Sequence, residues 1–307
     1  MPAHPPMQRT SQTAHGGNSS MIESNLDPWP VQALEATLGL PTTRTDAPVD
    51  LPPLWHWLYF LPTASRSSIG PDGHMVNQEW VDSTLRRRRL FAAARTEFLR
   101  PLRIGVRAQM TERVLGRRDK HGKSGDFQVV TAEYQYFQNE VLCVREERDI
   151  VYLQGPVPAQ PAPKDEFAIK TAATDSWTVT LTPDPVMLMR FSALTFNAHL
   201  IHFDQLYTQR EEGYPERVVH GPLVAVVLTR LLALNQVDRL ARFEFRARSP
   251  LYVNHPIQFM GKPASDRIEL RAIGVSGMLA MEATAWLSGP AEDSGTTDSS
   301  PKSARAP

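Results

Sequence analysis

The chain has 307 residues, which exceeds the usual size of one domain and favours two domains of about 100–150 residues each. Its 33 Lys and Arg residues balance 33 Asp and Glu residues, so net charge gives no argument for a nucleic-acid or anionic-membrane partner. The longest apolar runs, such as Leu223–Leu228, are far shorter than the roughly 20 residues of a membrane-spanning helix. We therefore expect a soluble protein that acts on a small molecule.

Residues 1–27 are predicted to be a disordered leader. The first twenty are rich in Pro, Ser, Gln, Gly and His, and they contain no apolar stretch that could form the core of a secretory signal. Cys143 is the only cysteine of the chain and lies in an alternating apolar segment, so we interpret it as a packing residue and expect no disulfide. We expect a cytoplasmic protein, or a mitochondrial one in a eukaryote.

The segment 28–155 is predicted to form one unit of helix followed by sheet. An amphipathic helix is expected at Val31–Leu40, and the aromatic run Trp55–Phe60 is interpreted as core packing. The basic run Arg86–Arg89 is interpreted as a solvated helix end. Alternating apolar residues then predict an antiparallel meander. Its strands are expected at Leu90–Phe98, Ile104–Val114, Phe127–Phe137 and Glu140–Leu153, with a turn at Asp119–Asp126.

The order of elements recurs in the second half of the chain. Residues 156–175 are predicted to be a linker rich in Pro, Ala and Lys, and 291–307 a disordered tail. Between them, 176–290 should form a second unit, with a strand at Ser176–Leu181 and helices at Val186–Phe196 and Gly221–Leu234. Four more strands are expected at Arg242–Ser249, Pro256–Met260, Ile268–Val275 and Met278–Leu287.

The two units also align residue by residue. When Pro101-Leu102 is set on Pro250-Leu251, the segment from Thr96 overlies the segment from Phe245. Each copy should carry a long central helix across a curved antiparallel sheet, which is the hot-dog arrangement. The sequence therefore predicts an α+β tandem double hot-dog, in which the two copies pair within one chain.

One stretch of the second unit carries the most informative motif. It reads FSALTFNAHLIHFD from Phe191 to Asp204, and it places His202 five residues after Asn197. Further on, Gly221 stands where a long helix should begin. The sequence resembles the MaoC-like hydratase and dehydratase family. Ser-Ala-Leu-Thr-Phe-Asn followed by His-x-x-His looks like the branch with mesaconyl-C4-CoA (3-methylfumaryl-CoA) and itaconyl-CoA hydratases and type 2 hydroxyacyl-thioester dehydratases.

This resemblance implies that Asn197 and His202 carry the chemistry. Hydration of an enoyl thioester requires a group that takes a proton from water, a proton for the α-carbon, and stabilisation of the charge that grows on the thioester oxygen. His202 suits the acid/base role, and Asn197 can hold the water through its amide. The backbone N–H of Gly221 can face the thioester oxygen. Most simple R-specific relatives have Asp where this chain has Asn197, so the identity of the general base is open.

Three further residues are interpreted as supporting groups around the site. His199 lies three residues before His202, but no third ligand of suitable spacing is visible, so no metal is expected. Asp204 either orients His202 or flanks a helix in solvent, and His220 either supports the site or is only structural. The first copy lacks an Asn/Asp–His pair at the five-residue interval, so we expect it to shape the pocket instead.

The expected function is a hydratase that adds water to an enoyl-CoA thioester and forms a branched β-hydroxyacyl-CoA such as citramalyl-CoA. Coenzyme A is part of the substrate, so no cofactor is expected. The expected partner is the acyl-CoA thioester, with no nucleic acid or membrane, and a homo-oligomer is left open. A second interpretation of Arg86–Arg89 is that these side chains contact the phosphates of coenzyme A. Two other functions remain: a 3-hydroxyacyl-thioester dehydratase of fatty-acid synthesis that uses acyl carrier protein, and a non-catalytic acyl-thioester-binding protein.

Overall fold

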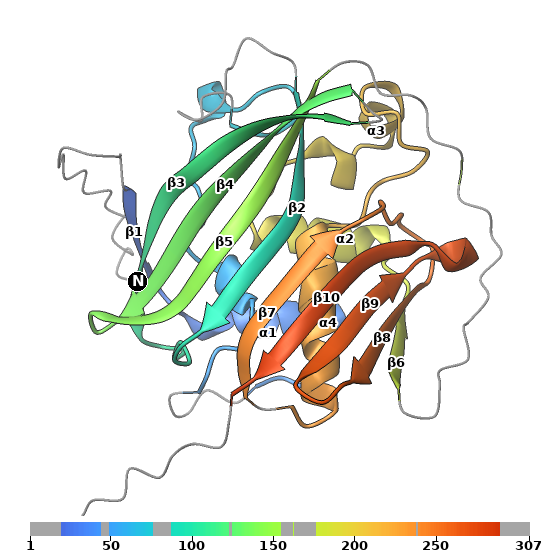
Figure 1. Cartoon of the computed structure of the whole chain (residues 1–307). Helices are drawn as coiled ribbons and strands as arrows, with labels where there is room; N and C mark the ends of the chain where they lie inside the picture. The colour runs from blue at the N-terminus through green and yellow to red at the C-terminus, as the bar shows by residue number, and fades with distance from the viewer. Residues whose placement is uncertain are drawn as a thin grey trace, which may run out of the picture.

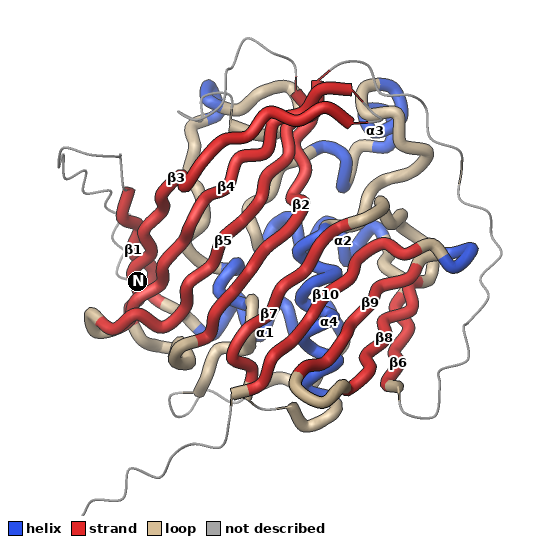
Figure 2. The backbone as a smooth tube through the Cα atoms, viewed as in Figure 1, coloured by secondary structure: helices blue, strands red, loops and turns tan. Residues whose placement is uncertain are grey.

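The computed structural model describes residues 20–43, 49–75, 87–122, 125–154, 162, 176–237 and 239–288. Within these ranges one 10-stranded sheet carries the helices on one of its faces (Figure 1), and Figure 2 shows this layering. The strands are β1 (Ser20–Asn25), β2 (Arg87–Phe98), β3 (Arg107–Gly122), β4 (Gly125–Gln138), β5 (Val141–Gln154), β6 (Trp177–Leu181), β7 (Leu240–Ala247), β8 (Ile257–Pro263), β9 (Arg267–Ile273) and β10 (Leu279–Leu287). The helices are α1 (Pro28–Leu38), α2 (Pro185–Leu194), α3 (Gln205–Arg210) and α4 (Gly221–Leu234), and four 3-10 turns are η1 (Trp55–Leu58), η2 (Arg66–Ser68), η3 (Leu200–His202) and η4 (Val275–Gly277).

The sheet consists of two equivalent five-stranded halves. Its strand order is β1-β3-β4-β5-β2-β7-β10-β9-β8-β6, and neighbouring strands are antiparallel. The halves join where Ala93–Glu97 of β2 pairs with Arg242–Arg246 of β7. An antiparallel sheet with helices on one face is an α+β fold. The predicted double hot-dog fold is therefore confirmed.

Two isolated bridges show the internal repeat at the level of single residues. Asp50 pairs with Arg103 in the first half, and Val218 pairs with Tyr252 in the second, both in antiparallel fashion. The alignment made from the sequence sets Arg103 on Tyr252, so the two bridges are equivalent. In each half the bridge anchors the chain just before it enters the layer beneath the sheet.

The second half carries the long central helix. α4 is apolar on nearly all sides, and nine of its residues are buried, because it packs against β8, β9 and β10. Pro222 lies in its first turn, where the missing N–H costs no hydrogen bond. The start of α4 is thereby fixed at Gly221, beneath the seam between the halves.

The expectation of a second long central helix is wrong. The equivalent place in the first half holds the short turn η1, and the backbone adopts left-handed φ values of 69° at Leu54 and 56° at Phe60 on either side. Residues with such φ angles interrupt a right-handed helix. A buried polar network fills the space: Glu146 accepts a hydrogen bond from the Trp57 indole at 3.1 Å and lies 3.1 Å from Nε2 of His56.

Three other expectations need correction, and those for the tail and the linker fall almost wholly outside the described residues. The leader is not irregular throughout, because Ser20–Asn25 pairs with β3 as strand β1. Arg88 and Arg89 lie in strand β2 and not at a helix end, since the strand runs from Arg87. The expected turn at Asp119–Asp126 is shorter, because β3 and β4 pair as far as Gly122 and Gly125. The tail 291–307 and all of the linker except residue 162 fall outside the described residues.

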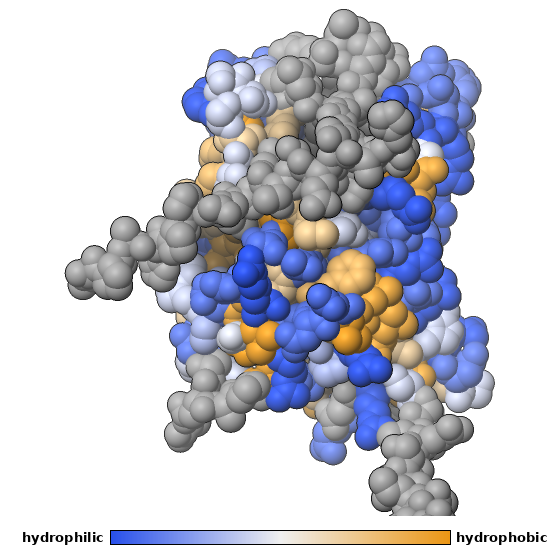
Figure 3. Space-filling model, turned by 90° about the vertical axis from the view of Figure 1, so that its left-hand side faces the viewer, coloured by the Kyte–Doolittle hydropathy of each residue, from blue (hydrophilic) through white to orange (hydrophobic). Residues whose placement is uncertain are grey.

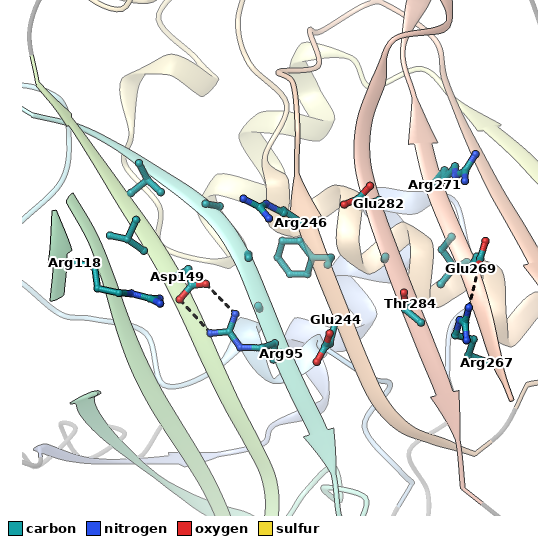
Figure 4. A pocket seen from close by; sticks show the side chains of 18 of the residues that line it. Arg95, Arg118, Asp149, Glu244, Arg246, Arg267, Glu269, Arg271, Glu282 and Thr284 are labelled. Carbon is teal, nitrogen blue, oxygen red and sulfur yellow. Dashed lines mark hydrogen bonds and ion pairs between the residues drawn. The ribbon is translucent and has the colours of Figure 1, made fainter. Parts of the chain in front are cut away.

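The outer face of the sheet is polar and open. A groove of about 670 Å³ crosses it at the seam, lined mainly by charged side chains (Figure 4). Arg95 pairs with Asp149 at 2.9 Å, and Arg267 lies 3.4 Å from Glu269. The face in Figure 3 mixes polar and apolar side chains, with the apolar ones in several separate patches. In the part of the chain that the structure describes, no helix is long and apolar enough to cross a membrane.

Candidate active site

The segment that carries Asn197 leaves α2 through a strained turn. Phe196 has a φ of 48°, and the N–H of Asn197 donates to the Ser192 carbonyl at 2.9 Å. A non-glycine residue in this left-handed region costs on the order of 1 kcal/mol, and such strain is often found at functional sites. The turn ends the helix and leads into η3, which carries His202.

His202 has a defined tautomer. Its Nδ1 lies 2.7 Å from the Val218 carbonyl oxygen, which can only accept, so Nδ1 carries the hydrogen and donates. The Nε2 atom is therefore left with a free lone pair. Burial lowers the pKa of His202 to about 4, because the charged imidazolium would lose its hydration. At neutral pH the ring is uncharged and can accept a proton at Nε2.

His220 stacks on His202 and holds it in place. The two ring centroids are 3.6 Å apart with an interplanar angle of 20°, and Nε2 of His220 lies 2.8 Å from Oγ of Ser192. Burial, and then the nearby His202, hold the pKa of His220 well below its usual value. The structure therefore favours a supporting role for His220, one of the two alternatives left open by the sequence. Ser192 is a residue that sequence reasoning missed, although it lies in the quoted motif.

His199 lies in a buried polar group that no sequence motif indicated. Its ring packs 4.1 Å from the ring of His74, and its Nε2 lies 3.7 Å from Oε1 of Glu212, beyond hydrogen-bonding distance. Burial first, and then the neighbouring histidines and Arg89, lower the pKa of His199 strongly. His74 is itself held by Asp72, with Nδ1 and Oδ2 3.3 Å apart. His199 therefore forms part of the wall of the site.

The first half of the chain contributes directly to this wall. The carbonyl of Asp72 accepts a hydrogen bond from the N–H of Leu200 at 3.0 Å. Gly73 has a φ of +93°, and a Cβ added to it would lie 1.8 Å from the carbonyl oxygen of Ala198. Only glycine allows so close a contact between these two backbones. The segment that contains Gly73 and His74 thus packs on the loop between Asn197 and His202.

Asp204 serves a helix rather than His202. Its Oδ1 accepts a hydrogen bond from the N–H of Tyr207 at 2.9 Å, which caps the start of α3. The alternative in which Asp204 flanks a helix is therefore the one that the structure supports, and the alternative in which it orients His202 is not.

Asn197 and Gly221 provide hydrogen-bond donors on either side of His202 in sequence. Oδ1 of Asn197 accepts from the N–H of His199 at 3.0 Å, which leaves the side-chain NH₂ group to donate. No side chain of the described residues caps α4, so the N–H of Gly221 points out of the helix start without a capping acceptor there. A Cβ added to Gly221 would meet only the Phe91 carbonyl oxygen, at an ordinary 3.9 Å. Packing of the protein alone therefore does not demand glycine there.

No group of three or more His, Cys, Asp and Glu side chains among the described residues is arranged to hold a metal ion. The buried groups around His202 are instead neutral imidazoles and hydrogen-bond donors. Such an arrangement can accept a proton and stabilise a developing negative charge.

The family model for hydroxyacyl-thioester dehydratase type 2 matches residues 54–253, which is more than half of the chain. The chain belongs to the hydroxyacyl-thioester dehydratase type 2 family. The match begins at the start of η1 and includes the whole segment from Asn197 to Gly221. The match therefore includes β2–β5 of the first half and β6 and β7 of the second, and the site described above lies inside it.

Two curated proteins are similar to this chain over most of its length. It is 43% identical over 275 residues to mesaconyl-C(4)-CoA hydratase of Chloroflexus aurantiacus, covering 89% of this chain and 96% of that protein. It is 28% identical over 269 residues to the mitochondrial hydroxyacyl-thioester dehydratase type 2 of Schizosaccharomyces pombe, covering 78% and 88%.

Solved structures share the fold at low sequence identity. A MaoC-like dehydratase from Phytophthora capsici has a TM-score of 0.66 at 15% identity, covering 90% of this chain and 96% of that one. HtdX of Mycobacterium tuberculosis has a TM-score of 0.62 at 14% identity, covering 87% and 98%. These likenesses support the double hot-dog fold.

Proposed function

We propose that this protein is a hydro-lyase that adds water to an enoyl-CoA thioester, with mesaconyl-C4-CoA (3-methylfumaryl-CoA) as substrate and citramalyl-CoA as product. The observation that carries the proposal is His202, a buried neutral imidazole with Nδ1 fixed on the Val218 carbonyl and Nε2 free to take a proton. The identity of 43% to a mesaconyl-C(4)-CoA hydratase supports the choice of substrate.

The proposed reaction begins with the water. The side-chain amide of Asn197 orients a water molecule, and Nε2 of His202 removes one of its protons as the oxygen attacks the β-carbon. The electron pair of the C=C bond moves towards the thioester and places negative charge on its oxygen. His202, now protonated, returns the proton to the α-carbon, so that one molecule of water has been added and the enzyme is restored.

The start of α4 stabilises the charge that develops on the thioester oxygen. The N–H of Gly221 donates to this oxygen, and the positive end of the helix dipole lies behind it. A donor aimed at the developing oxyanion typically contributes on the order of 3 kcal/mol to catalysis. The absence of a Cβ at Gly221 leaves room for the thioester. No metal or redox cofactor takes part in this scheme.

The Val218 carbonyl keeps His202 in its reactive tautomer, and His220, which is hydrogen-bonded to Ser192, holds the ring in place by stacking. The same groups run the reaction in reverse, because the transition state for hydration is also that for dehydration. The family name favours this second direction, the removal of water from a 3-hydroxyacyl thioester. We propose a CoA thioester rather than an acyl-carrier-protein substrate because the curated hydratase relative is the more similar of the two.

A substrate series tests the proposal. The purified full chain is assayed with 3-methylfumaryl-CoA, crotonyl-CoA, enoyl-CoA thioesters of increasing length and an enoyl-acyl carrier protein, by loss of the enoyl absorbance and identification of the product. We expect the highest kcat/KM with 3-methylfumaryl-CoA. A preference for long chains on acyl carrier protein would instead support the fatty-acid dehydratase, and no turnover of any thioester by folded protein would support a binding function.

A further inference from the structure

Three arginines lie close to the site, and one of them has no charge partner among the described residues. Arg148 lies 2.8 Å from the Glu146 carboxylate, and Nε of Arg88 lies 3.9 Å from Glu212. Arg89 makes neither an ion pair nor a hydrogen bond with any residue in the described ranges, and its Nε is buried without a partner. The Arg89 side chain is half-buried, and a guanidinium nitrogen that is shielded from water without an acceptor is unfavourable unless a ligand provides one.

The strand places Arg89 on the side of the sheet that faces the site. Side chains alternate along a strand, so Arg89 and Phe91 share one face of β2. The ring of Phe91 packs edge-on against Phe245 at 5.4 Å on the inner side, and the Phe91 carbonyl lies next to Gly221. The strand therefore places the half-buried side chain of Arg89 on the inner face, two residues from Phe91, whose carbonyl lies next to Gly221.

The charge of Arg89 also reaches the histidines of the wall. It contributes, after burial, to the lowered pKa of both His74 and His199, and each of these residues lies on or against the loop that carries Asn197. The guanidinium of Arg89 therefore lies within electrostatic range of the histidines that line the site.

We propose that Arg89 binds a free carboxylate on the acyl group and selects monothioesters of unsaturated dicarboxylic acids over neutral enoyl thioesters. The inference rests on the proposed hydratase function. In a 3-methylfumaryl thioester the carboxylate is attached to the carbon that receives water, so it must lie beside the groups that hold the water. A guanidinium binds a carboxylate through two parallel hydrogen bonds, which would also fix the face of the double bond.

The test compares two substrates in four proteins: wild type, Arg89→Met, Arg89→Lys and Arg246→Met. Met keeps the apolar stem of Arg89 without the charge, and Lys keeps the charge without the planar fork. Arg246 is an exposed arginine on the outer face of β7 and serves as the matched control (Figure 4). The readout is the ratio of kcat/KM for 3-methylfumaryl-CoA to that for crotonyl-CoA, with affinity for both measured by calorimetry.

We expect Arg89→Met to lower this ratio by about 100-fold, the usual effect of removing one partner of a buried charge pair. Arg89→Lys should lower it less, and Arg246→Met should leave it unchanged. An equal loss for both substrates in Arg89→Met, in turnover or in affinity, would overturn the proposal, as would a wild type without preference for the dicarboxylate substrate. Absence of turnover in the wild type, with the affinity difference intact, would contradict the hydratase function but support the role of Arg89.

Discussion

The protonation state of His202 can be measured without any substrate. The mechanism requires a neutral imidazole, and burial lowers the pKa of His202 from 6.5 to about 4. A group whose folded pKa is lowered binds its proton more readily in the unfolded chain. Its contribution therefore destabilises the fold as the pH falls from about 6.5 towards 4.

The magnitude follows from these two values. At pH 5 the unfolded chain is protonated at this residue and the folded protein is not, which costs about 2 kcal/mol of unfolding free energy, whereas at pH 7 the cost is close to zero. His202→Gln removes this titration. Urea unfolding of wild type and variant at pH 7 and pH 5 should show that the variant loses about 2 kcal/mol less than the wild type. Equal losses in the two proteins would refute a neutral, buried His202.

Three further predictions concern the residues around His202. Asn197→Ala should lower kcat, because it removes the donor to the water. Asn197→Asp should remain active with the pH dependence of kcat/KM shifted to higher pH, because a carboxylate favours the imidazolium. The pH profiles of both variants check this, and a harmless Asn197→Ala beside a severe Asp204→Asn would contradict it. Gly73→Ala should lower the free energy of unfolding by roughly 1–3 kcal/mol, and with it the melting temperature and the activity, since its Cβ would lie 1.8 Å from the Ala198 oxygen. Gly221→Ala should fold with an unchanged melting temperature, because within the protein the added methyl group makes only an ordinary 3.9 Å contact with the Phe91 carbonyl oxygen. It should lose activity, because the methyl group would enter the proposed position of the thioester; full activity would argue against that position for the substrate.

The sequence predicted the sheet well because its strands alternate in polarity and its two copies share a Pro-Leu turn. Arg88 and Arg89 were misassigned since a run of four basic residues shows no period-2 pattern, although β2 buries part of it. The missing central helix of the first half had a local signal, because Pro52 and Pro53 precede the aromatic run. The aromatic run packs in the core, as predicted.

The site was predicted only as far as its linear motif extends. Asn197, His199 and His202 belong to one segment, and the structure brings His220 and Gly221 to it through the bond between Val218 and His202. His74 and Glu212 could not have been found in this way. Both lie in irregular segments without periodicity. His74 reaches the site through packing of the first half on the second, and Glu212 follows α3 within the second half.

The central claim is that His202 is the acid/base group of an enoyl-CoA hydratase, and the kcat of His202→Gln on the preferred enoyl-CoA thioester tests it most directly. Gln keeps a similar volume and can still donate a hydrogen bond to the Val218 carbonyl, but it cannot take and return a proton. The account predicts a folded variant with kcat lowered by on the order of 100-fold or more. A folded His202→Gln protein with turnover close to that of the wild type would contradict it.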